Sequence, residues 1–399
     1  MSKIWDLIKN EKVEWKTIGE VCDIKRGTKI TKKIMEENKG EYPVYSSQTT
    51  NNGEIGKLNY YMFDGEYVTW TTDGCYAGTF YYRNEKFSAT THCGVLNVKR
   101  EPKLLTKFLY YYLTYDSVNL KNSIVGTIPL FTSEMVSSIK IPIPSIDTQN
   151  KIVKILDKFN IYVKELEHEL EHRNKQYQYY NELCFNDDFL KFLSNKYAAE
   201  SIVENKTLNQ LGVFIRGNNL TKKEIKNSGQ PVVRYGELHT KYKFETDFTY
   251  SFTDNDLFKK LKKAIKNDLM IVLTSEDNDG VCKTCIWSGD YEIGISSDMC
   301  IFRGNVNPYF LNHFFTTERF LKQKEKYLSG TNIIRISTDN LGKIDISLPS
   351  IVIQNLVSEK LNKLYKLSNS IYEGLPKEIK LRKQQYEYYR NKLLDFPKN

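Results

Sequence analysis

The sequence predicts an α+β fold built as a tandem duplication. Each copy is a β-rich domain followed by a long helix, and the two helices pair as an antiparallel coiled coil. Three observations predict this fold. The chain has 399 residues, which is too long for one ordinary domain. It repeats itself with a period of about 200 residues, and within each copy the texture changes once from β-like to heptad-like.

The repeat consists of three blocks that recur in the same order. The first block contains Arg26-Gly27 in one copy and Arg216-Gly217 in the other, and it aligns without a gap. Three matches in one order do not arise by chance, so the chain is a duplication. The matched blocks are Lys16–Lys33 with Lys206–Lys223, Ile141–Asn150 with Ile346–Asn355, and Arg173–Tyr180 with Arg382–Tyr389.

The repeat and the change of texture predict four segments. A first domain covers residues 1–147 and a first helical spacer covers 148–200. A second domain covers 201–350 and a second spacer covers 351–399. A period this long excludes a solenoid, whose repeats are 20–45 residues.

Each predicted domain contains short apolar stretches separated by turn residues, which is typical of β-strands. A helix-like stretch follows in each copy, at Lys103–Leu113 and at Tyr309–Tyr327. Next comes a short strand that ends at proline. The predicted strands are Tyr67–Trp70, Thr79–Tyr82, Val95–Val98, Leu269–Thr274, Cys285–Trp287 and Met299–Phe302.

Apolar residues then recur at alternating spacings of three and four, which predicts a heptad seam on a long helix. Gly374 and Pro376 interrupt the second seam, so a kink or break is expected there. A pseudo-twofold relation between the copies favours antiparallel pairing. The alternative is that each helix folds onto its own domain. The seam residues chosen for partner binding and pairing are Ile152, Leu156, Phe159, Val163, Leu166, Leu170, Leu361, Leu364, Ile371 and Tyr386.

The net charge of +9 makes a polyanion the first partner to consider, although the base composition of an A/T-rich genome would give a similar excess of lysine. Seven cysteines in a long chain indicate a reducing cytoplasm rather than a disulfide framework. No apolar run is long enough to cross a membrane, and the first residues lack the apolar core of a signal peptide. The sequence therefore predicts a cytoplasmic protein that does not enter a membrane.

Three catalytic motifs can be set aside. Asn307-Pro308-Tyr309-Phe310 resembles an adenine-methyltransferase tetrad, but it lacks the second proline and reads instead as a helix start. Its predicted counterpart in the first copy is Glu101–Leu104. The Glu-x-Lys triplets at Glu14–Lys16 and Glu101–Lys103 lack the acidic strand of a nuclease centre, and no phosphate-binding loop for ATP occurs.

Cys282-Lys283-Thr284-Cys285 is a single C-x-x-C, and Cys300 and His313 are further candidate zinc ligands. The first copy carries Ala77 and Phe80 where the second carries the two cysteines, so the fold does not need a metal there. Buried thiols explain the pattern, and no metal or catalytic residue is predicted in this chain.

Two diverged β domains joined by helices on a basic chain suit the reading of two sites on one polymer, and duplex DNA fits best. Polar loops would read bases while Lys and Arg contact phosphates. Arg26 and Arg216 occupy one repeat position, where either a phosphate contact or a salt bridge that closes the domain is expected. The candidate DNA-binding residues are Arg26, Lys29, Ser47, Gln48, Asp73, His92, Arg216, Lys222, Arg234, Glu237, His239, Asn278, Lys283 and Ser297.

These blocks resemble the specificity subunit of type I restriction-modification systems over essentially the whole chain. The strings that carry the resemblance are Gly126-Thr127 or Gly330-Thr331, then Ile141–Ser145 or Ile346–Ser350, then Gln149 or Gln354, and a closing R-x-x-Q-Y-x-Y-Y. The family usually has Glu before that Gln, whereas this chain has Thr148 and Ile353.

The resemblance implies two target recognition domains, each reading one half of a bipartite, asymmetric DNA sequence. The helices would set the spacing and dock two modification subunits, which bring S-adenosylmethionine. ATP-dependent restriction subunits, which use Mg, would add translocation and cleavage, and this chain would carry no cofactor and no catalysis. The alternative function is a non-catalytic coiled-coil scaffold that binds other proteins. That scaffold gives no reason for two diverged domains with polar loops.

Overall fold

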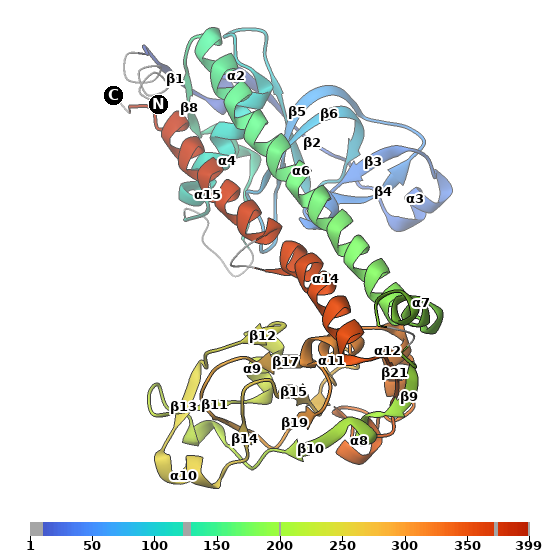
Figure 1. Ribbon diagram of the computed structural model, residues 1–399. Helices are drawn as coiled ribbons and strands as arrows, with labels where there is room; N and C mark the ends of the chain where they lie inside the picture. The colour runs from blue at the N-terminus through green and yellow to red at the C-terminus, as the bar shows by residue number, and fades with distance from the viewer. Residues whose placement is uncertain (1–10, 123–128, 199–200, 371–373, 398–399) are drawn as a thin grey trace. The chain divides into compact units, whose positions relative to one another are not determined.

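The computed structural model describes residues 11–122, 129–198, 201–370 and 374–397. By its internal contacts the chain divides into two compact units (Figure 1). Unit 1 contains residues 1–167 and 378–399, and unit 2 contains residues 168–377. Each unit therefore combines one β-rich domain, the start of the helix that follows it and the end of the helix from the other copy. The predicted domain boundaries do not capture this exchange.

In unit 1, a six-stranded sheet has the order β2-β7-β5-β6-β3-β4, and β1 and β8 form a separate antiparallel pair. The longest strands, β5 and β6, pair from Phe63↔Phe87 to Trp70↔Phe80. The elements are β1 Glu14–Thr17, α2 Ile18–Val21, β2 Cys22–Arg26, α3 Lys32–Glu37, β3 Tyr42–Tyr45, η1 Thr50–Gly53, β4 Glu54–Leu58, β5 Phe63–Thr71, β6 Phe80–Ala89, β7 Cys93–Val98, α4 Thr106–Asn122, α5 Ser133–Ser137, β8 Lys140–Ile143 and α6 Ile146–Cys184.

Unit 2 contains two larger sheets. One has five strands in the order β10-β19-β15-β17-β12, and the other has four strands in the order β13-β11-β18-β14. The elements before the β15–β17 region are α7 Asp187–Tyr197, β9 Glu204–Thr207, α8 Leu208–Leu211, β10 Gly212–Arg216, η2 Lys222–Glu224, β11 Gln230–Val233, α9 Tyr235–Thr240, β12 Glu245–Thr246, β13 Ser251–Thr253, α10 Asn255–Lys260 and β14 Lys263–Ala264. The later elements are β15 Leu269–Val272, β16 Thr274–Ser275, β17 Thr284–Trp287, β18 Ile293–Ile295, β19 Met299–Gly304, α11 Pro308–Phe314, α12 Glu318–Glu325, β20 Ile334–Arg335, α13 Thr338–Leu341, β21 Asp345–Leu348, α14 Ile351–Asn369 and α15 Leu375–Leu394.

The two copies share their framework hydrogen bonds, which confirms the duplication. The first strand of each domain pairs with the strand before the long helix, as β1 with β8 and β9 with β21. The amide of Ile18 donates to the Ile139 carbonyl over 2.9 Å, and the amide of Leu208 donates to the Ile344 carbonyl over 3.0 Å. Capping boxes at Thr17 and Thr207 start the same short helix in both copies.

The predicted strands are present, but two helical predictions are wrong in detail. The helix expected at Lys103–Leu113 is α4, which begins at Thr106 and runs to Asn122. The stretch Tyr309–Tyr327 is two helices, because the Thr317 hydroxyl accepts from the Phe320 amide and starts α12 anew. The helix start at Asn307-Pro308 is confirmed, with Pro308 in the first turn.

The buried glutamine that opens each long helix fixes the register between the copies. In unit 1, Leu105 donates its amide to Gln149 Oε1 over 2.8 Å, and in unit 2 Asn307 donates to Gln354 Oε1 over 2.9 Å. Asn307 therefore corresponds to Leu105, four residues beyond the counterpart that the sequence suggested. Each glutamine also donates to the carbonyl five residues before it, at Pro144 and at Pro349. In unit 1, Thr148 binds the carboxylate of Glu11 over 3.0 Å.

Along each helix the heptad seam first packs on the core of the preceding domain and then contacts the other helix. Ile152 and Leu156 are buried in the core of the first domain, and Leu361 is buried in the core of the second, with Leu364 packed against it. Farther along α6, Val163 and Leu166 are also buried. Both readings of the seam are therefore partly right, because each helix packs first on its own domain and then pairs.

Within unit 1 the pairing of α6 with α15 is antiparallel. Phe159 stacks on Tyr389 with ring centroids 5.3 Å apart, and Glu167 forms an ion pair with Lys383 over 2.6 Å. The contacts run in opposite directions along the two helices, because a higher residue number in α6 pairs with a lower residue number in α15. In unit 2, Tyr177 of α6 contacts Tyr365 of α14, with centroids 5.4 Å apart. The expected break is present, since α14 ends at Asn369 and α15 begins at Leu375. Ile371 lies outside the described residues.

An equivalent polar contact joins the helices to each domain. In unit 2, His313 of α11 is fully buried, its Nδ1 accepts from the Tyr177 hydroxyl over 2.9 Å, and its Nε2 donates to Asn362 over 2.8 Å. In unit 1, the Tyr111 hydroxyl donates to Asp157 over 2.5 Å. The glutamine register places Asp157 at the position of Asn362. The equivalent contact is therefore tyrosine with carboxylate in unit 1 and histidine with amide in unit 2.

The joint of unit 2 predicts a pH dependence. Burial lowers the pKa of His313 to about 4 from its ordinary value near 6.5. Between these values the unfolded chain takes up a proton that the folded chain does not. We therefore expect the free energy of unfolding of unit 2 to fall by on the order of 3 kcal/mol as the pH drops from about 6.5 to about 4. Denaturant unfolding of the wild type and of His313→Gln measures it, and a pH profile that the substitution leaves unchanged would contradict it.

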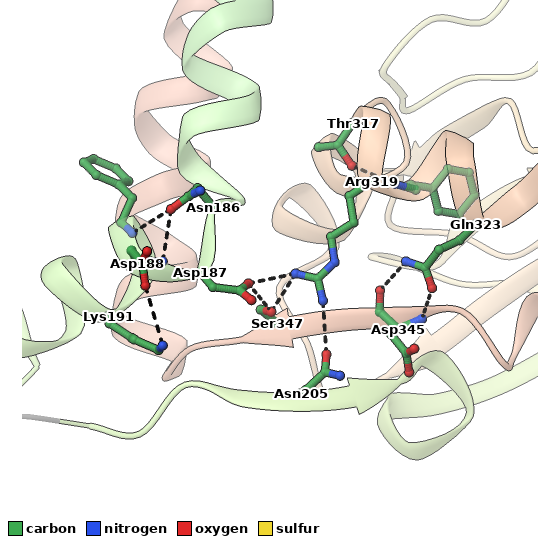
Figure 2. A network of polar contacts seen from close by, with 12 residues as sticks. Asn186, Asp187, Asp188, Lys191, Asn205, Thr317, Arg319, Gln323, Asp345 and Ser347 are labelled. Carbon is green, nitrogen blue, oxygen red and sulfur yellow. Dashed lines mark hydrogen bonds and ion pairs between the residues drawn. The ribbon is translucent and has the colours of Figure 1, made fainter.

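A second network fixes α7 to the domain of unit 2 (Figure 2). Arg319 of α12 donates to Asp187 of α7 over 2.8 Å and to Ser347 of β21 over 2.7 Å, and its other nitrogen donates to Asn205 of β9 over 3.2 Å. Nearby, Gln323 exchanges two hydrogen bonds with the main chain of Asp345. The segment that follows the first long helix is thus held at Asp187 by side chains from α12 and β21, and Asn205 of β9 fixes the arginine in turn.

No helix in the described part of the chain is both long and apolar enough to span a membrane.

Candidate nucleic-acid interface

Three loops that carry predicted site residues meet at one edge of the first domain. The amide of Thr90 donates to the Tyr45 carbonyl over 2.9 Å, and its hydroxyl donates to Ser46 over 2.9 Å. The amide of Thr28 donates to the Ala89 carbonyl over 2.9 Å. These bonds bring the turn after Arg26, the loop after Tyr45 and the turn before Cys93 together.

A fourth loop joins this edge through a carboxylate–imidazole contact. Asp73 Oδ2 contacts His92 Nδ1, and the Thr72 amide donates to the His92 carbonyl over 3.2 Å. His92 is exposed while Asp73 is half-buried. The structure therefore brings together Asp73 and His92, which are 19 residues apart in sequence, as a paired donor and acceptor at the surface.

The second domain presents the equivalent edge. The amide of Ser296 donates to the Val233 carbonyl over 3.2 Å, just as that of Thr90 donates to Tyr45. Arg216 Nε donates to the Ser297 carbonyl over 2.9 Å, and the Tyr235 amide donates to the Ser296 hydroxyl over 3.2 Å. The same set of loops is therefore assembled on the same main-chain contacts in both units.

A cavity of about 840 Å³ opens at this edge of unit 2, with carboxylates and cations in its wall, including His239, Asp277, Lys283 and Arg335. Lys283 Nζ donates to the His239 carbonyl over 2.6 Å, which ties the loop Asp277–Lys283 to α9. Burial lowers the pKa of the Lys283 ammonium. Such a mixture of donors and acceptors can read the edge of a base pair.

The repeated Arg-Gly pair is explained by close approach of two main chains. A Cβ on Gly27 would lie 1.9 Å from the Ala89 carbonyl oxygen, and one on Gly217 would lie 2.2 Å from that of Ser296. Only glycine fits there. The preceding Arg26 and Arg216 are both exposed at the end of a strand. Among the described residues neither arginine forms a salt bridge, although the charge of Arg26 acts on the carboxylate of Glu134.

The other predicted site residues fall into three classes of exposure. Glu237 is the one correction, because its side chain is only 4% exposed and accepts from the Ser251 hydroxyl over 2.6 Å inside the domain. It holds α9 in place and is not available to a base. The exposed residues are Lys29, His92, Lys222 and Asn278, and the half-buried ones are Ser47, Gln48, Asp73, Arg234, His239, Lys283 and Ser297.

Sequence reasoning placed Ser46 and Tyr235 in the candidate loops Ser46–Asn52 and Arg234–His239, and the structure has both at the two edges. It missed Arg335, which lies in the wall of the unit 2 cavity and reaches it from β20, far along the chain. Arg335 lies beside these loops because β20 pairs with β16, and this strand pairing cannot be predicted from the sequence.

The three cysteines and the histidine that suggested a zinc site do not gather into a ligand cluster among the described residues. Cys282, Cys285 and Cys300 are buried, and burial raises the pKa of the Cys282 thiol to about 12. Strand register places Cys285 opposite Met270 and Tyr81 opposite Thr69. The counterpart of Cys285 is therefore Tyr81, one position from the Phe80 that the sequence suggested. No cluster of metal-binding side chains occurs among the residues that the structure describes.

Comparison with known proteins identifies the family of this chain. The family described as "Type I restriction modification DNA specificity domain" matches residues 10–173 and 200–381, once in each copy. The chain belongs to this type I DNA specificity family. The family Gln149 and Gln354 are the buried register residues described above, whereas Gly126 and Thr127 lie outside the described residues.

Relatives and solved structures agree with the assignment. A putative type I specificity subunit of Mycoplasma pneumoniae is 31% identical over 96% of this chain and 97% of its own. The specificity subunit of the type I restriction enzyme MpnII, from the same organism, is 41% identical over 42% of this chain and 52% of its own. The fold matches a crystal structure of the S subunit from M. genitalium with a TM-score of 0.61 at 16% identity, covering 98% of both chains. The described fold of this specificity subunit is therefore that of a solved S subunit.

Proposed function

We propose that this specificity subunit recognises a bipartite, asymmetric duplex sequence, with each unit reading one half. The observation that carries the proposal is a pair of loop edges with the same main-chain scaffold and different side chains. Where unit 1 offers His92, unit 2 offers Asp298, since the carbonyl of each accepts from the amide just after a strand, Thr72 after β5 or Leu273 after β15. Different donors and acceptors on equal scaffolds read different bases.

The proposal includes the partners that supply the chemistry. Two modification subunits would bring S-adenosylmethionine and transfer methyl groups to adenine, and restriction subunits would use ATP and Mg for translocation and cleavage. A solved structure from an assembly study of a type I system resembles this fold with a TM-score of 0.56. The role left to this chain is to place its partners on DNA. A coiled-coil scaffold that binds only proteins would not need two exposed polar edges.

The direct experiment measures binding to DNA that carries the target and to DNA of random sequence. The chain, assembled with its modification subunits, should retard the target at concentrations at least a hundredfold lower, because specific complexes exceed non-specific ones by about 10³ or more. Equal retardation of both DNAs at physiological salt would contradict the proposal. Purified alone, the chain should transfer no methyl group and cut no DNA.

Arg26→Ala and Arg216→Ala should each weaken binding uniformly across DNA sequences. Both side chains are exposed beside a loop edge and neither forms a salt bridge among the described residues, so phosphates are their natural ligands. The slope of log affinity against log salt should fall by about one for each substitution. Titrations at four salt concentrations measure it, with Arg100→Ala as the matched exposed control. A lowered melting temperature with an unchanged slope would show that the arginines only stabilise the domain.

The helices should bind two copies of one partner, because their exposed apolar residues are duplicated. Tyr388 in unit 1 is 56% exposed and its counterpart Tyr179 in unit 2 is 65% exposed. Ile146 and Ile351 repeat the pattern at the helix starts. We expect Tyr179→Ala or Tyr388→Ala to leave one modification subunit bound and the double substitution to leave none. Mass determination of the assembly checks this, and full occupancy of the double variant would count against the site.

A further inference from the structure

Each unit contains a buried cation that does not pair with a carboxylate among the described residues. Arg83 of β6 is 2% exposed and Lys324 of α12 is 3% exposed. A buried charge without an acidic partner is costly, so fully buried Arg and Lys are rare unless paired. Arg83 donates to one main-chain carbonyl and Lys324 donates to two, and in both units those carbonyls belong to a candidate base-reading loop.

In unit 1 the cation holds the loop between β3 and β4. The Arg83 guanidinium lies 3.5 Å from the centroid of the Tyr45 ring and 4.7 Å from that of Tyr81. Its Nη2 donates to the Asn52 carbonyl over 2.7 Å and its Nε donates to Thr69 over 3.3 Å. Nη1 is buried and has no hydrogen-bond partner among the described residues.

The loop that Arg83 holds turns through two asparagines with positive φ. Asn51 and Asn52 have φ of 49° and 54°, in the left-handed region. The Ser46 amide donates to the Gly53 carbonyl over 3.0 Å and closes the loop. Ser47 and Gln48 lie within it. Because the carbonyl of Asn52 is aimed inward at a fixed cation, the direction of this loop depends on Arg83.

In unit 2 the buried cation comes from a different element, α12, but it also binds main-chain carbonyls of a candidate base-reading loop. Lys324 Nζ donates to the Asn278 carbonyl over 2.8 Å and to the Val281 carbonyl over 3.2 Å. Both carbonyls belong to the loop Asp277–Lys283, which lines the cavity of unit 2. Cys282 in this loop has φ of 66°, again in the left-handed region. Two unrelated cations therefore fix two loops whose main chains would otherwise relax.

We propose that Arg83 and Lys324 are positioning residues for sequence recognition, each setting the base preference of its own half-site from beneath the loop without touching DNA. The inference rests on the proposed function and deepens it, because it places specificity at two buried positions. Neither cation is accessible to a phosphate. Removing either one frees the loop above it and leaves the electrostatic contacts with DNA in place.

The test compares Arg83→Met and Lys324→Met in the full assembly with modification subunits. Methyl transfer is measured on a duplex library in which each half-site is randomised in turn. Arg83→Met should reduce the preference for the first half-site at least tenfold and leave the second unchanged, and Lys324→Met should do the reverse. The salt slope should stay at the wild-type value for both. Arg83→Lys, which keeps a charged donor, should retain more of the preference than Arg83→Met.

Gly53→Ala gives an independent variant if Arg83→Met fails to fold. Gly53 has φ of +85°, a main-chain conformation that alanine rarely adopts, so the loop shifts while the charge of Arg83 remains. Gly280→Ala is the matched variant of unit 2, where a Cβ would lie 2.1 Å from the Ser275 hydroxyl oxygen. The expected result is again a loss of preference confined to one half-site.

Two results would overturn the inference. A uniform loss of binding with a salt slope reduced by about one would make Arg83 a phosphate contact. An unchanged motif with a lowered melting temperature would make it a purely structural residue. If the wild-type assembly itself shows no sequence preference, the proposed function fails. If the wild type discriminates and the variants discriminate equally well, only the inference fails.

Discussion

A fragment cut after Lys196 should form a homodimer that directs methylation of a palindrome made from two copies of the first half-site. Unit 1 needs the end of a second helix, since Leu393, Leu394 and Phe396 of the C-terminal segment are buried in its core. The repeat places Cys184 and Phe185 at the positions of Leu393 and Leu394, and Phe185 is already buried in the equivalent core of unit 2. A second copy of α6 can therefore cover the first domain through an isologous interface.

The dimer should be weaker than the intact chain, because Asp187 stands where Phe396 fills the core. The loss of a buried phenyl ring costs about 3–5 kcal/mol. Tyr177 occupies the repeat position of Tyr386, so the contacts of that tyrosine ring can form in the dimer as they do in the intact chain. Light scattering and methylation mapping check the prediction, with Tyr177→Ala in the same fragment as a control that should remain monomeric. A dimer that still directs methylation of the asymmetric sequence would contradict the assignment of one half-site to each unit.

Insertion of four residues after Lys164 should lengthen the spacer of the recognised sequence by about two base pairs. The helix α6 is continuous over 39 residues and passes from unit 1 into unit 2. At about 1.5 Å per residue, four residues add about 6 Å. Each base pair adds about 3.4 Å. The bases within each half-site should stay the same, because the loops are untouched.

The control for this insertion places the same four residues after Asn227, in an exposed bend between η2 and β11. That variant should keep the original spacing. Methylome sequencing of cells that express each variant gives the two spacers directly. An unchanged spacer in the α6 variant would show that the long helix does not set the distance.

The sequence predicted the architecture well because the duplication is a property of the chain that needs no coordinates. The seam from Ile152 to Leu166 and the break at Gly374 could be predicted from spacing and residue type alone. The exchange of helix ends between units could not, because a heptad pattern does not say which neighbour buries it. Ile152 and Leu156 look like any other seam residues, yet they belong to the core of a β domain.

The candidate site was predicted less completely. The loops were identified because their polar residues follow strands, and their equivalence between copies came with the repeat. Glu237 was misassigned because a carboxylate in a polar helix start gives no sign of being buried. Arg83 and Lys324 were missed for the opposite reason, since a cation in a basic chain reads as solvent-exposed. Burial of a charged side chain depends on contacts distant in sequence, such as that of Arg83 with Asn52.

The central claim is that one chain reads two different half-sites with two equivalent edges. The most direct measurement is methylome sequencing of a cell that carries this chain with its modification subunits, compared with a cell that lacks only this chain. The account predicts that methylated adenines in one bipartite, asymmetric motif with a non-specific spacer disappear when the chain is absent. Retention of every methylated motif, or loss of a motif that is a continuous palindrome, would contradict it.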